Sequence, residues 1–143
     1  VVYSTMTVAT SLLCGPVIDR IGALRIVRVM LFPAIVGLGL LASFDTKFVV
    51  WPYMALIGVT TGVTYTAVAA MWAELYGVAH LGAIRSVATS VGIFGSALGP
   101  VIMGAGFDFG ASVAMVSWCF AAYMIAASLL LWVATRPRSE KPA

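Results

Sequence analysis

Five stretches of the sequence are rich in apolar side chains and nearly free of charge, and they limit what this chain can fold into. They cover residues 1–14, 24–44, 48–72, 84–107 and 111–134. A helix of about 20 apolar residues spans the roughly 30 Å hydrocarbon core of a bilayer. The four later stretches are long enough to do so. The first is too short, so we expect its beginning to be missing and the chain to be a fragment.

The composition agrees with a membrane setting. Hydrophobic residues make up 62% of the chain and charged residues only 9%, against about 25% charged residues in ordinary soluble domains. The apolar stretches are too long for the alternating segments of about 10 residues that build an outer-membrane barrel. Backbone polar groups in lipid must pair within a helix or a closed barrel. The predicted fold class is therefore all-α, a polytopic transmembrane helix bundle of about five spans.

The basic residues predict the orientation. Positively charged loops stay in the cytoplasm, and the expected connections on one side carry all the Lys and Arg residues except Lys47. We therefore expect a cytoplasmic carboxy terminus, with residues 135–143 as a cytoplasmic tail. The net charge of +3 is interpreted as membrane topology, and no nucleic-acid partner is expected. The residues on the basic side are Arg20, Arg25, Arg28, Arg85, Arg136, Arg138 and Lys141.

The connection after the first apolar stretch has an unusual composition. Gly15 and Pro16 should end the first helix, because proline lacks an amide hydrogen and clashes with the preceding turn. Asp19 offers a carboxylate that can cap a helix or pair with an arginine. Gly22 permits a positive φ angle. Arginine side chains here can reach carboxylates or lipid phosphates.

This connection resembles the cytoplasmic loop signature of the major facilitator superfamily. The matching residues are Gly15-x-x-x-Asp19-Arg20-x-Gly22, with Arg25 as the following basic residue. The family carries this signature between its second and third helices, with a weaker copy between the eighth and ninth. With only five spans here, the resemblance implies the second copy, and hence a partial major-facilitator fold. The chain departs from the fullest pattern at residues 23–24, where basic residues are frequent.

The rest of the chain extends the resemblance. Residues 73–85 are similar to the loop between the tenth and eleventh helices of many bacterial members, including the monocarboxylate-type carriers. Ser96 to Pro100, Gly104 and Asp108 resemble the eleventh helix and its outer end. The resemblance implies the carboxy-terminal half of a carrier in a bacterial inner membrane. Its expected partners are the lipid bilayer, the missing amino-terminal half and a small solute, with a monocarboxylate-like organic anion favoured.

In the family, the cytoplasmic loops hold one access state closed, so the resemblance implies a gate. Solvated surface charges worth about 0–1 kcal/mol are the alternative. The candidate gate residues are Gly15, Asp19, Arg20, Gly22, Arg25, Glu74 and Arg85.

Two groups of hydroxyl-bearing residues fall on single helix faces by their spacing. We expect them to line a substrate cavity, because the matching helices line the central pathway in the family. The alternative is that each hydroxyl bonds the backbone of its own helix. The candidates are Thr61, Thr64 and Tyr65 in the third stretch, and Ser86, Thr89 and Ser90 in the fourth.

Small residues at four-residue spacing allow two helices to approach closely. Gly58 and Gly62 have this spacing in the third stretch, and Gly95 and Gly99 have it in the fourth. Pro100 should bend the fourth helix and create a hinge. Plain packing without a hinge is the alternative.

The sequence offers no catalytic, metal or cofactor site. Cys14 and Cys119 have no ligand neighbours at metal-binding spacing, and the lone histidine, His80, is expected in a wet loop. We therefore predict a fragment of a secondary transporter that moves a small solute by alternating access. A scaffold subunit of a larger membrane complex is one alternative. A membrane-embedded transferase is another, and it would need clustered His, Asp or Glu residues that the sequence lacks.

Overall fold

A computed structural model describes residues 1–44, 46–77 and 81–135, and every regular element in them is helical. Four segments are long and apolar enough to cross a membrane: Ala23–Ser43, Lys47–Tyr76, Leu81–Asp108 and Val113–Ala134. The predicted all-helical membrane bundle is therefore confirmed. The elements are α1 (Val2–Ile21), α2 (Ala23–Val29), α3 (Phe32–Ser43), a 3₁₀ turn η1 (Lys47–Val49), α4 (Val50–Tyr76), α5 (Leu81–Asp108) and α6 (Val113–Ala134).

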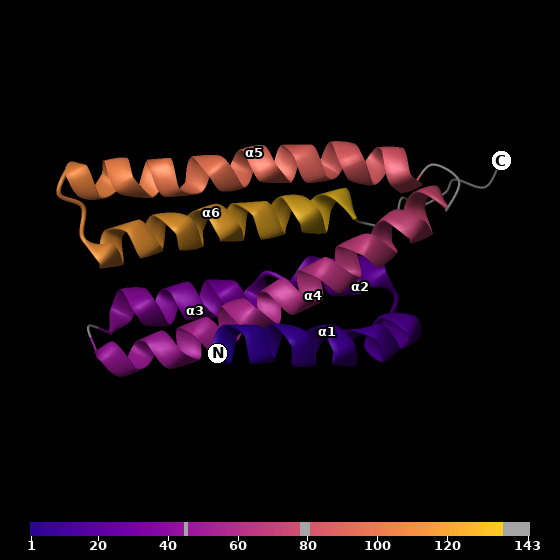
Figure 1. The fold of residues 1–143 in the computed structure, drawn as a ribbon, viewed down its shortest axis with the longest axis horizontal. Coiled ribbons are helices and arrows are strands. Elements are labelled where there is room, and N and C mark those ends of the chain that lie inside the picture. Colours follow the sequence, from indigo (N-terminus) through magenta and orange to yellow (C-terminus); the bar gives the residue numbers. More distant parts are fainter. Residues whose placement is uncertain (45, 78–80, 136–143) are drawn as a thin grey trace.

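The helix α4 is the centre of the arrangement (Figure 1). It packs along α1 over the most extensive interface in the bundle and also contacts α2 and α3. Helix α6 packs on α3, whereas α5 makes only sparse contacts with α4 and α6. No residue of α5 is buried. The bundle therefore has a packed side around α1–α4 and an open side along α5.

The prediction that Gly15 and Pro16 end the first helix is wrong. Helix α1 continues through Pro16 to Ile21 and ends at Gly22, whose φ of 89° is open to glycine but costly for other residues. Pro16 removes only one backbone hydrogen bond of α1. The side chains of Cys14 and Ile18, on either side of it, are buried, so packing keeps the helix intact. The expected loop of residues 15–23 is reduced to one glycine.

The second apolar stretch was predicted as one continuous helix, but it is interrupted. Helix α2 ends at Val29, and α3 begins at Phe32 with Pro33 in its first turn. Pro33 has no amide hydrogen to donate, and its ring disfavours a regular helix through the preceding turn. The backbone of Met30 and Leu31 stays in the right-handed helical region, so the break is a kink within one membrane span.

The other helix ends differ from the predicted ones by a few residues. Helix α4 runs on to Tyr76, where Gly77 takes a φ of 68°, and α5 already begins at Leu81. Helix α6 begins at Val113, where the hydroxyl of Ser112 accepts a 3.2 Å hydrogen bond from the Met115 amide. Helix α5 runs through Pro100 without interruption (Figure 1). His80 and the tail of residues 136–143 lie outside the described residues.

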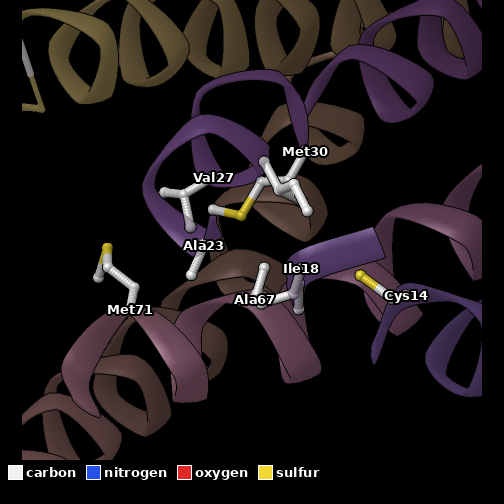
Figure 2. Close-up of a cluster of buried hydrophobic side chains, with 8 residues drawn as sticks. Cys14, Ile18, Ala23, Val27, Met30, Ala67 and Met71 are labelled. Atoms are coloured by element: carbon white, nitrogen blue, oxygen red, sulfur yellow. The ribbon is translucent and has the colours of Figure 1, made fainter. Parts of the chain in front are cut away.

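A compact apolar cluster joins α1, α2 and α4 (Figure 2). Although α2 has only seven residues, it supplies more members than either longer helix. Lipid is as apolar as the cluster, so the gain comes from close packing more than from leaving water. The members are Cys14, Ile18, Ala23, Ile26, Val27, Met30, Ala67 and Met71.

Two glycines allow α1 and α4 to touch backbone to backbone. A Cβ on Gly58 would lie 2.6 Å from the Tyr3 carbonyl oxygen, and one on Gly62 would lie 2.5 Å from that of Thr7. The approach also lets the Ser11 hydroxyl donate a 3.2 Å hydrogen bond to the Gly62 carbonyl across the interface. By contrast, a Cβ on Gly95 would meet no atom within 4 Å in the described part of the chain.

Replacing Gly62 with alanine should force α1 and α4 apart. Overpacking a tight interface costs about 1–3 kcal/mol, so we expect Gly62→Ala to lower the thermal unfolding temperature of the protein in detergent. Gly39→Ala, in α3, is the matched control, because its new methyl group meets no atom within 4 Å among the described residues and should leave the temperature unchanged or slightly raised. Equal unfolding temperatures for the two variants would contradict this account of the interface.

Candidate functional site

A groove of about 590 Å³ lies between α4 and α5, and it is the more polar of the two larger grooves of the bundle. Arg85 lies near the start of α5, and Trp72 lies near the end of α4, so both belong to the same end of the groove. The lining residues are Thr64, Tyr65, Val68, Ala69 and Trp72 of α4, and Arg85, Ala88, Thr89, Gly92, Ile93 and Ser96 of α5.

The groove contains some of the predicted cavity residues and not others. Thr64, Tyr65 and Thr89 line it, whereas Thr61, Ser86 and Ser90 do not. The structure also places Arg85, which was predicted as a gate residue, beside these hydroxyls.

The sequence reasoning missed Trp72 and Ser96 as groove residues. Their spacing carried a usable signal, because side chains four residues apart share a helix face. Trp72 follows Thr64 by two such steps, and Ser96 continues the face of Arg85 and Thr89.

Most hydroxyls near the groove donate to their own helix backbone. The Thr64 hydroxyl donates to the Thr60 carbonyl at 2.7 Å, and the Ser96 hydroxyl donates to that of Ile93 at 2.8 Å. Such a hydroxyl has used its only hydrogen and can offer a ligand only an acceptor oxygen. The alternative given above, that each hydroxyl bonds the backbone of its own helix, also holds for three other candidates. The hydroxyls of Thr61, Ser86 and Ser90 donate to the backbone carbonyls of Ile57, Ala83 and Ser86, respectively.

Other donors in the groove have no such partner. Arg85, Tyr65 and Thr89 make no hydrogen bond or ion pair in the part of the chain that the structure describes. Tyr65 is 71% exposed, so its phenol is open to a ligand. No Asp or Glu is among the described lining residues. A guanidinium with two hydroxyl donors on facing helices suits an oxyanion, because arginine binds carboxylates through paired hydrogen bonds.

A second feature links the ends of α4 and α1. The Glu74 carboxylate accepts a 2.9 Å hydrogen bond from the Ala23 amide. Ala23 is fully buried, and its amide is one of the first in α2, where no helical partner exists. A carboxylate at this position also meets the positive end of the helix dipole. Glu74, predicted as a gate residue, is therefore engaged with the α1–α2 junction.

The remaining predicted gate charges surround this junction. Asp19 and Arg20 lie in the last turn of α1, and Arg25 lies in the first turn of α2. All three are exposed and have no hydrogen-bond or ion-pair partner among the described residues. Gly15, also predicted in the gate, is helical and lies within α1.

A third polar contact was not predicted. The Arg28 guanidinium donates to the Thr135 hydroxyl at 2.8 Å through Nε, and it also donates to the Thr135 carbonyl. The contact joins α2 to the end of α6, where backbone carbonyls lack helical partners and favour a cation. No local sequence signal could reveal it, because the two residues are 107 positions apart.

The described arginines all lie at the same end of the helix bundle. The α1–α2 junction, the end of α4 and the start of α5 lie at one end of the bundle, on the right of Figure 1. These elements carry Arg20, Arg25, Arg28 and Arg85. Lys47 lies between α3 and α4, at the opposite end.

Comparison with known proteins agrees with this architecture. The family model described as Major Facilitator Superfamily matches residues 1–143. The chain belongs to the major facilitator superfamily. This is a family of membrane transporters that bind small solutes, and not an enzyme family. No curated protein and no solved structure matches the chain at a significant level.

The Glu74 contact yields a stability test. Glu74→Ala would leave the buried Ala23 amide unpaired, and an unsatisfied buried donor costs about 1–3 kcal/mol. We therefore expect a lower thermal unfolding temperature for this variant in detergent. Glu74→Gln keeps an acceptor oxygen at the same place and should retain a large part of the stability. A Gln variant as unstable as the Ala variant would mean that the charge, and not the hydrogen bond, matters.

Proposed function

We propose that this chain forms the carboxy-terminal half of a secondary transporter and that the α4–α5 groove contributes to its solute site. The observation that carries the proposal is the groove itself, where Arg85, Tyr65 and Thr89 present donors that have no partner among the described residues, from two facing helices. Secondary transporters that are built from helix bundles bind their solutes between helices, near the middle of the membrane. The groove reaches from Arg85, at the basic end, toward that depth along α4 and α5.

The proposed solute is a small organic anion. An isolated arginine and neutral donors would bind a carboxylate, and Val68, Ile93 and Trp72 would contact a short apolar portion of the solute. No acidic side chain among the described lining residues would repel it. A scaffold subunit, the alternative raised from the sequence, would have no use for such a groove.

The proposed mechanism is alternating access, in which two helix bundles rock about the solute. Helix α5 has no buried residue, and its glycines at 95 and 99 meet open space. This exposure fits a helix that packs against the amino-terminal half of the transporter. Rocking would then open and close the α4–α5 groove to either side.

The gate is proposed at the basic end of the bundle, on the cytoplasmic side. Glu74 ties the end of α4 to the α1–α2 junction, so these elements would move as one body. Asp19 and Arg20, exposed on the same junction, would contact the other half in one access state only. The bacterial inner membrane and a cytoplasmic carboxy terminus are part of this proposal.

The solute assignment is tested at Arg85. We expect the natural full-length protein, expressed in bacterial cells, to take up radiolabelled lactate or pyruvate. Arg85→Gln should raise KM at least about tenfold, because a charged hydrogen bond is worth about 1.5–3 kcal/mol. The KM of Arg85→Lys should fall between those of the unchanged protein and Arg85→Gln, because lysine keeps the charge but cannot form the paired hydrogen bonds of a guanidinium.

Lys47→Gln serves as the control, because it removes the same charge at the opposite end of the bundle. An unchanged KM in Arg85→Gln, or an equal change in Lys47→Gln, would contradict a role for Arg85 in binding the solute. Uptake of neutral solutes with no uptake of any carboxylate would contradict the organic anion.

The gate is tested at Asp19. Asp19→Asn removes a charge from an exposed residue without a described partner, so we expect slower transport and an unchanged unfolding temperature. The change in rate should be several-fold if the carboxylate stabilises one access state by about 1 kcal/mol. Asp108→Asn makes the same substitution at the opposite end of the bundle and should transport normally. Normal rates in Asp19→Asn would reduce this residue to an ordinary exposed helix position.

A further inference from the structure

A second groove, of about 440 Å³, lies along α1, α2 and α3. Val63 of α4 lines it, whereas the next residues, Thr64 and Tyr65, line the groove on α5. The two grooves therefore lie on different faces of α4. The second groove is lined mostly by aliphatic side chains, and its polar members are Thr10, Cys14 and Arg25.

The groove is open on its outer side. Leu13, Val17, Ile21 and Val29 all line it and are all exposed. In water such a strip would be unfavourable, but in a bilayer it meets lipid chains. What distinguishes it from an ordinary lipid-facing surface is the hollow between α1 and the kinked α2–α3 span.

Arg25 is the only charged residue that lines the groove within the described chain. It lies in the first turn of α2, at the basic end of the bundle, and it has no hydrogen-bond or ion-pair partner among the described residues. A guanidinium carries five donors in a planar fork that matches a phosphate. Where a membrane span meets the membrane–water interface, the most abundant anionic groups are lipid phosphates.

The length of the groove matches one leaflet. Its lining residues on α1 extend from Thr10 to Ile21, which is about 16 Å at the helical rise of 1.5 Å per residue. Its lining on the second span extends from Arg25 to Pro33, about 12 Å by the same rise. Half of the roughly 30 Å hydrocarbon core is about 15 Å. An acyl chain that begins below the interface could therefore occupy the groove to its end.

We propose that this groove binds one phospholipid of the leaflet at the basic end of the bundle. Arg25 holds the phosphate, and one acyl chain lies along Leu13, Val17 and Val29. The lining on the second span ends at Pro33, directly after the kink. The site is separate from the proposed solute groove, and it does not depend on the proposed transport function.

Native mass spectrometry of the full-length protein in detergent tests the site, with palmitoyl-oleoyl phosphatidylglycerol as the added lipid. We expect one tightly bound lipid, and about tenfold weaker binding in Arg25→Gln, as for loss of a charged hydrogen bond. Lys47→Gln, with the same charge change at the other end, should bind as the unchanged protein does. Diacylglycerol with the same acyl chains should bind about tenfold more weakly, because it lacks the phosphate.

The apolar part of the site has its own pair of variants. Val29→Trp fills the groove and should weaken binding of phosphatidylglycerol several-fold, whereas Val133→Trp, at a similarly exposed position on α6, should not. Val29 is 63% exposed and Val133 is 62% exposed, so both variants should fold, which their unfolding temperatures will check.

Three outcomes would overturn the proposal. They are equal binding in Arg25→Gln and the unchanged protein, equal binding of diacylglycerol, and equal effects of the two tryptophans. The first would also be seen if a helix of the other half of the transporter filled the groove. Because none of these measurements depends on solute uptake, their failure would leave the proposed transport function untouched.

Discussion

In lipid, apolar side chains gain little by leaving their surroundings, so helices associate through close packing and polar contacts. The whole bundle depends on this constraint. Its largest interface, between α1 and α4, forms where Gly58 and Gly62 remove the side chains that would hold the backbones apart. The same approach brings the Ser11 hydroxyl to the Gly62 carbonyl. With bulkier residues at these two positions, α4 could not hold the position from which it contacts α1, α2, α3 and α5.

The short helix α2 is held from both ends by the polar contacts that the constraint favours. Glu74 of α4 binds the first amide of α2, and Arg28 of α2 binds the end of α6. Between these contacts, Ala23, Ile26 and Val27 are buried in the apolar cluster. Helices α1, α4 and α6 therefore all contact the seven residues of α2. A movement of α2 would therefore displace α1, α4 and α6 together.

The central position of α4 also separates two environments. One side faces α5 and carries hydroxyls, a tryptophan and the neighbouring Arg85, whereas the side near α1 and α3 is almost wholly aliphatic. Each groove has a single arginine at the basic end. In the first, the surrounding donors suit a small solute. In the second, the aliphatic walls suit a lipid chain. An arginine at the same end of the bundle thus suits a different ligand in each groove, because the residues that line the rest of the two grooves differ.

Much of the fold follows from local sequence properties. Apolar stretches of membrane length determine where the later helices lie, because lipid forces backbone groups to pair within a helix. The glycine spacing at 58 and 62 correctly indicated a position of close approach. Gly22 and Gly77 end helices with positive φ angles that the sequence allowed at those points. The arginines of the described residues gather at one end of the bundle, whereas Lys47 lies at the other, as their positions between the apolar stretches predicted.

Other features were decided only by tertiary structure. Pro16 was expected to end α1 but does not, because burial of Cys14 and Ile18 outweighs one lost hydrogen bond, whereas Pro33 does break its span. Apolar residues follow both prolines in the sequence, so the sequence alone does not show which of them interrupts a helix. Likewise, Glu74 finds Ala23, and Arg28 finds Thr135, across 51 and 107 residues. Sequence determined which segments enter the membrane, since that depends on each segment alone. Which polar group meets which depends on how the helices pack, and no single segment contains that information.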